Sequence, residues 1–363
     1  MNNNQELGVG SREYKKILMV RLDRIGDVLL STPAIKAVRD AYPDSHIAFM
    51  VQPYAKDIVE GNPYLNEVIC YDKGGREGGL FGNLGFIMKL RQKKFELAII
   101  LHPTVRTHIV TLLAGIGVRA GFDKKMGFLL TNRIPHLKEL GDRHEIDYTL
   151  DILKNIGIAP KDRSLYMPLK SESEERVKNI FNRNNIKDTD MVISVNPGAS
   201  CASKRWSAER FARVSDSIIE RYGARVIILA GMADKFFGDR TASLIRKGCI
   251  NLSGNTSVAD LASVLKRSRL FISNDSGPVH IACAIGTPVV AIFGRSDKGL
   301  SPKRWGPSGK YDIVLHKYVG CDVCLAHNCN IGFKCLEAIT VNDVLAAVEK
   351  ILSQSVKREE GRG

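Results

Sequence analysis

Short apolar runs alternate with helical patterns along the whole chain, and this alternation constrains the fold more than any other feature. The runs are built of aliphatic and β-branched residues and are too short for free-standing helices. Alternation of this kind is typical of parallel sheets whose strands are joined by crossover helices. The runs cover residues 15–22, 45–52, 67–72 and 97–103, and then 191–198, 224–231, 249–254, 269–275 and 288–294. We therefore predict an α/β fold.

A polar stretch over residues 161–190 interrupts the pattern, which restarts directly after it. The stretch opens with a linker and carries a charged helix. With 363 residues the chain is longer than one ordinary core accommodates, so two domains are expected. We predict two Rossmann-like domains, the first over 14–165 and the second over 191–340, with the linker and charged helix over 166–190 and a final helix over 341–353. Ligands of such sheets bind outside the carboxyl ends of the strands.

The segment "NDSGPVHIA" follows one predicted strand and has the features of a phosphate site. Gly277 allows close approach of the backbone, and Pro278 suits the first turn of a helix. The N–H groups of that turn, at the positive end of the helix dipole, would hold a diphosphate, and His280 would add a donor. The alternative is a plain helix cap made by Asp275 or Ser276, with a packed histidine.

Three further strand ends carry candidate site residues. In "NPGASCASKRW", Lys204 would neutralise the charge that develops on a leaving diphosphate, or it lies in a solvated basic loop. In "RLDRIGD", Asp27 would accept a proton from an attacking hydroxyl, or it caps the next helix. Asp234, after "LAGMA", lies where an acidic side chain reaches a ribose hydroxyl in such folds, although Asp is also a common cap.

Nucleotide-binding motifs of the commonest kinds are missing from the sequence. It contains no G-x-x-x-x-G-K-[ST] motif, which argues against a P-loop. The glycines of "GIGVRAG" follow a helical pattern and have the wrong spacing for a dinucleotide fingerprint. Hydride transfer of the usual kind is therefore disfavoured.

The chain is strongly basic, with 53 Lys and Arg against 39 Asp and Glu, a formal net charge of +14. Such a surplus favours a polyanionic partner, which would be nucleic acid, an anionic membrane surface or a phosphorylated substrate. Aromatic residues make up only 7% and do not alternate with basic ones, unlike in single-strand binders. No apolar run is long enough to span a bilayer and no secretory signal opens the chain, so a cytoplasmic location is expected.

The blocks described above occur together and in a fixed order. They are "RLDRIGDVLLSTPAIKAVRDAYP", "NPGAS…KRWSAERF", "ISNDSGPVHIACAIGTPVVAIFG" and a cysteine-containing tail. Over residues 15–353 the chain resembles the family 9 glycosyltransferases, the ADP-heptose:lipopolysaccharide heptosyltransferases. The resemblance implies a GT-B fold, in which two Rossmann-like domains face each other across a cleft. It implies that the N-terminal domain binds the acceptor, that the C-terminal domain binds the nucleotide sugar, and that the final helix packs back toward the N-terminal domain.

The resemblance also implies the reaction, which is inverting transfer of heptose that requires no metal or other cofactor. Asp27 matches the family's general base, and Lys204 matches the lysine that contacts the donor diphosphate and sugar. The other matches are donor-binding residues and two positions that resemble acceptor-phosphate contacts. The donor residues are Asp234, Asp275, Ser276, Gly277 and His280, and the acceptor positions are Arg119 and His144. The implied partners are ADP-heptose, a phosphorylated acceptor of the lipid A–Kdo type (Kdo-lipid A or heptosyl-Kdo-lipid A) and an anionic membrane surface, with no nucleic acid. Such an acceptor implies peripheral attachment to the cytoplasmic face of the inner membrane, which the basic surplus of the chain suits.

Four of the eight cysteines cluster in "CDVCLAHNCNIGFKC". The first pair has the spacing that chelates one tetrahedral ion, and His327 is a further candidate ligand. A structural zinc or iron is one interpretation, reduced thiols are another, and disulfides are a third. The four residues are Cys321, Cys324, Cys329 and Cys335.

Two other functions remain open at this stage. A heptosyltransferase of this kind would also fit a protein or another glycan as acceptor. A zinc-dependent nucleic-acid-binding protein would account for the charge and the cysteines, but not for two α/β halves with polar strand ends.

Overall fold

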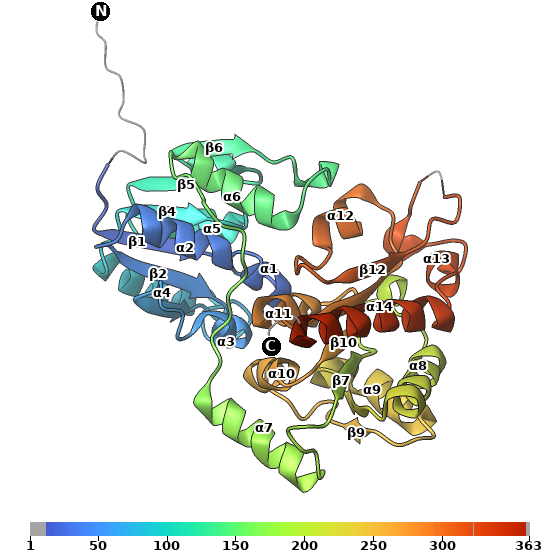
Figure 1. Ribbon diagram of the computed structural model, residues 1–363. Coiled ribbons are helices and arrows are strands. Elements are labelled where there is room, and N and C mark those ends of the chain that lie inside the picture. The colour runs from blue at the N-terminus through green and yellow to red at the C-terminus, as the bar shows by residue number, and fades with distance from the viewer. Residues whose placement is uncertain (1–11, 322, 361–363) are drawn as a thin grey trace, which may run out of the picture. The chain divides into compact units, whose positions relative to one another are not determined.

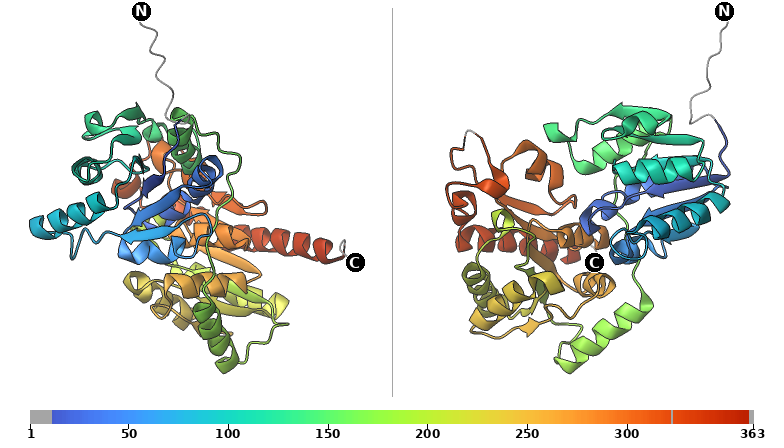
Figure 2. Two further views of the ribbon diagram at one scale, coloured as in Figure 1. Left: turned by 90° about the vertical axis from the view of Figure 1, so that its left-hand side faces the viewer. Right: turned by 180° about the vertical axis from the view of Figure 1, so that it is seen from behind.

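The structure is a computed structural model that describes residues 12–321 and 323–360. Residues 1–11, where no secretory signal is expected, lie outside the described residues. The chain divides into two compact units. Unit 1 comprises the described residues up to 139 together with 143–168, and unit 2 comprises 140–142 and the residues from 169 onward. Each unit is built on one parallel sheet with helices on both faces (Figures 1 and 2).

Unit 1 has six parallel strands in the order β3-β2-β1-β4-β5-β6. The strands are β1 (Lys16–Val20), β2 (His46–Val51), β3 (Glu67–Cys70), β4 (Leu97–Ile100), β5 (Val118–Asp123) and β6 (Asn132–Pro135). The helices are α1 (Ile25–Leu29), α2 (Thr32–Ala41), η2 (Pro53–Ala55), α3 (Lys56–Val59), α4 (Leu80–Gln92), α5 (Val105–Leu113), η3 (Gly127–Leu129), η4 (Lys138–Leu140) and α6 (Glu145–Asn155). The central strand β4 is fully buried, as its continuous apolar sequence predicts.

Unit 2 repeats this topology, with the order β12-β11-β10-β7-β8-β9. The strands are β7 (Val192–Asn196), β8 (Arg225–Ile228), β9 (Ile250–Asn251), β10 (Leu270–Asn274), β11 (Val289–Phe293) and β12 (Ile313–His316). The α-helices are α7 (Ser171–Arg183), α8 (Ala208–Tyr222), α9 (Lys235–Leu244), α10 (Val258–Lys266), α11 (Gly277–Ile285), α12 (Pro302–Trp305), α13 (Lys334–Glu337) and α14 (Val341–Glu360). Four short 3₁₀ turns are η5 (Ala202–Lys204), η6 (Met232–Asp234), η7 (Lys298–Leu300) and η8 (Ala326–Asn328).

All nine predicted strands are present, although most are shorter than their apolar runs. Three strands were not predicted, namely β5, β6 and β12. In β5 the sequence "VRAGFD" breaks the apolar run with a charge and a glycine, and β6 and β12 are edge strands without a buried residue.

The helices at the two ends of unit 2 differ in how they pack. The predicted charged helix, α7, lies beside α10, and Arg176 bonds Asp260 there at 3.0 Å between Nε and Oδ1. The final helix, α14, buries Val344, Val348 and Ile351 in the core of unit 2, against α8 and strands β10 to β12. Packing of this helix toward the first domain stays a prediction.

The strand order of both units is that of a doubly wound sheet, whose direction of winding reverses at one point. In unit 1 the reversal lies between β1 and β4, and in unit 2 it lies between β7 and β10. Ligands of open α/β sheets bind beyond the carboxyl ends of the strands at such points. The residues that follow these four strands are therefore the strongest candidates for a ligand-binding site.

Candidate functional site

In unit 1 a buried arginine follows β1 and collects three carboxylates. Arg21 is 2% exposed, and its Nε lies 2.7 Å from Asp23 Oδ1. Its Nη2 lies 2.8 Å from Asp27 Oδ1 and 3.3 Å from Glu145 Oε1. Lys138 forms a second ion pair with Glu145. We call these five residues the Arg21 cluster; it holds three acidic side chains against two basic ones.

Asp27 is the member of this cluster with proton-accepting character. Burial and the charge of Asp23 raise the pKa of Asp27 to about 6, against the opposing effect of Arg21. Nearby, burial and the charge of Arg21 lower the pKa of His102 to about 4, so this imidazole is neutral at pH 7. A carboxylate whose pKa is close to the working pH is better suited to take up a proton than one at its ordinary value.

The geometry of Asp27 leaves one side of the carboxylate available. Asp27 lies in the first turn of α1, and its side chain is 14% exposed. Oδ1 accepts the bond from Arg21, and no partner of Oδ2 is found among the described residues. The alternative of a helix cap is not what the structure shows, since the N-cap position is Arg24 and no side chain caps α1.

In unit 2 the arrangement is reversed, because one buried carboxylate collects two cations. Asp275 follows β10 and is 5% exposed. Its Oδ2 lies 3.1 Å from Lys204 Nζ, in η5 after β7, and 2.6 Å from Arg295 Nη2, after β11. We call these three residues the Asp275 cluster. It holds one positive charge in excess beyond the ends of three adjacent strands, where an anion is the complementary ligand.

Burial also acts on the two cations. Lys204 has a side chain that is 13% exposed, and burial lowers its pKa while Asp275 opposes that effect. Arg295 is 4% exposed. Taking cations out of water is costly unless anions compensate them, and one carboxylate is shared by two cations here. A diphosphate would complete the compensation.

Two asparagines hold the loops that carry this cluster. Asn274 donates to the carbonyl of Pro197 at 2.8 Å and accepts from the Trp206 N–H at 3.0 Å, which ties the turn after β7 to the loop of Lys204. Asn196 donates to the hydroxyls of Ser273 and Ser276, both at 3.0 Å. Some of the polar residues between β10 and β11 therefore have a structural role, while others are candidates for binding a ligand.

The start of α11 differs from a plain helix cap. Ser276 occupies the N-cap position, but its side chain makes no cap hydrogen bond and Pro278 follows in the first turn. The N–H groups at the start of α11, beginning with Gly277, are therefore not covered by the Ser276 hydroxyl. His280 lies on the buried side of this helix and is only 4% exposed.

Asp234 lies at the end of η6, close to the turn after β7. A side chain at Gly198 would approach the Asp234 Cβ to 2.9 Å, so the glycine is needed for this close approach. Burial raises the pKa of Asp234, and Arg205 opposes this effect. Arg205 in turn stacks over the Phe237 ring, with its guanidinium carbon 3.6 Å from the ring centroid.

The two predicted acceptor positions lie in different surroundings. The Arg119 guanidinium bonds backbone carbonyls, including Leu129 at 2.9 Å and Gly117 at 3.2 Å, so it stabilises the region around β5. His144 is the N-cap of α6, and its Nδ1 accepts from the Ile146 N–H at 3.3 Å. His144 directly precedes Glu145 and is therefore next to the Arg21 cluster in the chain.

Four of the residues in the two clusters were not singled out by the sequence: Arg21, Lys138, Glu145 and Arg295. Arg295 comes directly after a predicted strand and Arg21 lies near the end of another, and this position is the signal that would have found them. Glu145 and Lys138 lie more than a hundred residues from Asp27 and carried no local signal.

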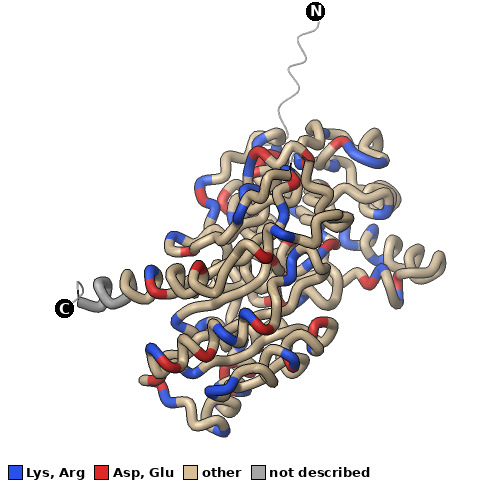
Figure 3. The backbone as a smooth tube through the Cα atoms, turned by 90° about the vertical axis from the view of Figure 1, so that its right-hand side faces the viewer, with Lys and Arg blue, Asp and Glu red and all other residues tan. Residues whose placement is uncertain are grey.

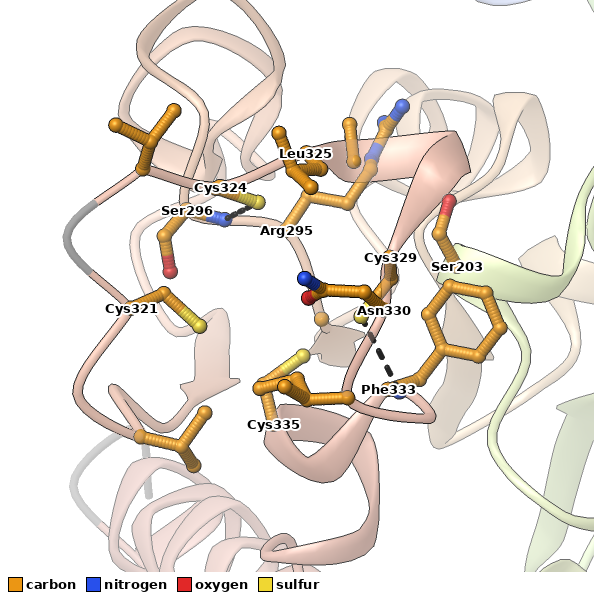
Figure 4. A pocket seen from close by; sticks show the side chains of 15 residues that line it. Ser203, Arg295, Ser296, Cys321, Cys324, Leu325, Cys329, Asn330, Phe333 and Cys335 are labelled. Carbon is orange, nitrogen blue, oxygen red and sulfur yellow. Dashed lines mark hydrogen bonds between the residues drawn. The ribbon is translucent and has the colours of Figure 1, made fainter.

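The four clustered cysteines line one pocket in unit 2 (Figure 4). All are free thiols, and backbone N–H groups of Ser296 and Phe333 donate to the sulfurs of Cys324 and Cys329, each at 3.4 Å. In residues 12–321 and 323–360, no group of three or more His, Cys, Asp or Glu side chains is arranged to hold a metal ion. The structural zinc or iron therefore has no support in this geometry.

The cysteine pocket adjoins the Asp275 cluster, a relation that the sequence did not predict. Arg295 and Ser203, which directly precedes Lys204, both line the pocket. His327 Nδ1, from the same tail, lies 3.4 Å from the Ser203 hydroxyl. The tail therefore supports the loop that carries Lys204.

Comparisons with known proteins agree on one family. The family model described as "Glycosyltransferase family 9 (heptosyltransferase)" matches residues 84–334. "Lipopolysaccharide heptosyltransferase 3" of Escherichia coli K12 is 26% identical over 344 residues, which cover 91% of this chain and 96% of that protein. "Lipopolysaccharide heptosyltransferase 2" of the same strain is 24% identical over 298 residues, or 79% and 85%.

Solved structures show the same relation. The crystal structure of the glycosyl transferase family 9 from Veillonella parvula DSM 2008 superposes with a TM-score of 0.85 at 28% identity and covers 95% of this chain and 99% of that one. The structure of the E. coli ADP-heptose lps heptosyltransferase II gives a TM-score of 0.78 at 22% identity, covering 94% and 99%. The predicted α/β fold of two Rossmann-like units is confirmed.

Proposed function

Because this chain belongs to glycosyltransferase family 9 and has the GT-B fold, we propose that it transfers heptose from ADP-heptose to the inner core of lipopolysaccharide. The proposal takes the donor and acceptor from what its relatives are named for. The observation that carries it is the Asp275 cluster, in which Lys204 and Arg295 share one carboxylate. Such an excess of positive charge at a strand end suits the diphosphate of a nucleotide sugar.

The donor half of the proposal rests on unit 2. Lys204 and Arg295 would contact the diphosphate and stabilise the negative charge that grows on ADP as it leaves. The N–H groups at the start of α11 would bind a phosphate oxygen, helped by the helix dipole. Asp275 would orient both cations and the sugar, and Asp234 would bind the ribose. His280 would support the phosphate contact from within α11.

The acceptor half rests on unit 1, with Asp27 as the general base. In the proposed step an acceptor hydroxyl oxygen forms a bond to the anomeric carbon of heptose while the bond from that carbon to the ADP phosphate oxygen breaks. The bonding electron pair leaves with ADP, and the hydroxyl proton goes to Oδ2 of Asp27. A single displacement of this kind inverts the configuration at the anomeric carbon. Arg21 would hold the Asp27 carboxylate in place by its bond to Oδ1.

We further propose a Kdo-lipid A or heptosyl-Kdo-lipid A acceptor, reached at the cytoplasmic face of the membrane. The net charge of +14 supports attraction to an anionic lipid surface, and Lys and Arg are spread over both units (Figure 3). None of the described helices is long and apolar enough to cross a bilayer. Arg119 and His144 are the proposed contacts to acceptor phosphates.

The test is release of ADP, measured with ADP-heptose against other sugar nucleotides and with defined truncated lipid A–Kdo acceptors. We expect release that needs both ADP-heptose and one of these lipids, and that persists in EDTA. Transfer only to a protein or to another glycan would overturn the proposal that lipopolysaccharide is the acceptor, while the proposal that ADP-heptose is the donor would stand. No ADP-heptose turnover with any acceptor would overturn the whole proposal.

A further inference from the structure

Helix α4 in unit 1 is apolar on two faces, although the sheet covers only one of them. Phe86, Ile87 and Leu90 are buried in the core beneath it. On the other side Phe81 is 88% exposed, and three more large apolar residues share that face. These are Leu80, Leu84 and Met88, at 80%, 52% and 50% exposure. With 3.6 residues per turn, the four exposed side chains fall within an arc of roughly 100°.

The exposed apolar surface continues onto the neighbouring elements. Helix α5 packs beside α4, and η3 packs beside α5. Together the three elements carry eight of the eighteen large apolar residues exposed in the described part of the chain. The four beyond α4 are Val105, Leu112, Leu113 and Phe128. We call these eight residues the α4 face; α4 itself forms the left edge of the left view in Figure 2. Large exposed apolar residues gathered in this number on neighbouring elements mark an interaction site.

Basic residues accompany the α4 face, and α4 and α5 contain no acidic residue. Lys89, Arg91 and Lys94 lie at the C-terminal end of α4 and directly after it, and no ion pair of theirs is found among the described residues. Lys125 is exposed just before η3. An amphipathic surface that combines Phe, Leu and Met with Lys and Arg is typical of proteins that lie in the interface of an anionic bilayer.

We propose that the α4 face inserts into the headgroup region of an anionic lipid bilayer and holds unit 1 there. The inference extends the proposed function, since a lipid-linked acceptor is reached at such a surface. Charge complementarity favours this occupant over a second copy of the chain. In a two-fold symmetric dimer the same patch meets itself, so Lys89, Arg91 and Lys94 would approach a second patch that is also basic. Anionic lipid headgroups instead attract each of these side chains.

The experiment is co-sedimentation with vesicles that contain neither donor nor acceptor, so that its outcome does not depend on sugar transfer. The vesicles are phosphatidylethanolamine with one quarter phosphatidylglycerol, compared with phosphatidylcholine alone. The test variant is Phe81→Ser with Leu84→Ser. The control is Phe236→Ser, which removes a 69% exposed aromatic from α9 in unit 2. Circular dichroism and ADP binding by calorimetry report whether the test variant is folded.

We expect the wild type and the control to bind the anionic vesicles and the double variant to bind roughly tenfold more weakly or worse, since two large apolar side chains no longer enter the bilayer. Binding to phosphatidylcholine should be weaker for all three proteins. Equal binding by wild type and double variant would overturn the proposal. So would a wild type that ignores anionic vesicles but loses a dimeric state on substitution, which would assign the face to self-association. If the vesicle result holds while no ADP is released from ADP-heptose, the proposed function fails and the membrane surface stands.

Discussion

The Arg21 cluster in unit 1 and the Asp275 cluster in unit 2 occupy equivalent places in two sheets of the same topology, yet their charges are opposite. In unit 1 two cations serve three carboxylates, and in unit 2 two cations serve one. The same doubly wound scaffold therefore presents an excess of negative charge at one switch point and an excess of positive charge at the other. A transfer reaction needs both, a base for the acceptor and a stabiliser for the leaving group.

The two clusters also differ in what burial does to them. In unit 1 burial, together with the charge of Asp23, raises the pKa of Asp27 to about 6, so this group binds a proton more readily than an ordinary Asp. In unit 2 burial lowers the pKa of Lys204, and the charge of Asp275 opposes this effect. One cluster is arranged to take up a proton and the other to hold an anion. The predictions below test this division.

The largest effect should come from Asp27→Asn. The amide keeps the size and shape of the side chain but cannot act as a base, so we expect turnover to fall by about 10²–10⁴-fold. Calorimetry should show unchanged ADP binding, because the donor residues lie in unit 2. Asp40→Asn, at an exposed carboxylate paired with Lys36, is the matched control and should retain full activity. Full turnover in Asp27→Asn would remove Asp27 as the base.

A loss of about 10²–10³-fold in kcat is expected for Lys204→Met, which removes one of the two cations that would stabilise the leaving diphosphate. This variant should also weaken ADP binding, in contrast to Asp27→Asn. Lys303→Met, at an exposed lysine in α12, controls for the loss of one positive charge. If Lys204→Met released ADP at the wild-type rate, the Asp275 cluster would not be the diphosphate site.

A smaller effect, on the pH dependence of kcat/KM, should show whether Glu145 tunes Asp27 or has only a structural role. Since Asp27 must be ionised to act as a base and its pKa is about 6, kcat/KM should fall as pH drops through 6. Glu145 raises the pKa of Asp27 by its charge, so Glu145→Gln should move this acidic limb to lower pH. Glu139→Gln, at a residue that is 69% exposed, should leave the limb in place. An unmoved limb in Glu145→Gln would show that the Arg21 cluster does not tune Asp27.

The sequence predicted the fold and part of each cluster, for reasons that differ between residues. Buried parallel strands have continuous apolar runs, so β1, β4, β7, β10 and β11 were visible, and the polar residues after them pointed to Asp27, Lys204 and Asp275. Because Glu145 and Lys138 reach Arg21 only through the tertiary fold, no local pattern marks them. Arg119 was marked by its sequence context, and the structure shows its guanidinium bonding backbone carbonyls around β5. Its contact with an acceptor phosphate stays a prediction.

The cysteine tail adds a further feature of unit 2 to this comparison, since its pocket adjoins the Asp275 cluster. Ser203 and Arg295 line the cysteine pocket. The sulfurs of Cys324 and Cys329 accept hydrogen bonds from backbone N–H groups, and a change at either sulfur would disturb these bonds. We expect Cys324→Ser to raise the KM for the donor severalfold with little change in kcat, because it alters the support of Arg295 and not the reacting groups. Cys70→Ser, in unit 1, is the matched control.

Metal analysis of protein purified without a His-tag accompanies this comparison, because a structural zinc or iron at the four thiols predicts a stoichiometric metal that Cys324→Ser loses. A metal-free wild type with an unchanged donor KM in Cys324→Ser would contradict both the structural metal and the supporting role of the tail. A metal-free wild type with a raised donor KM in that variant would leave the support to packing and hydrogen bonds. The donor KM of Cys324→Ser thus tests whether the strand ends of the sheet alone position the cations of the Asp275 cluster, or whether the cysteine tail of unit 2 also positions them.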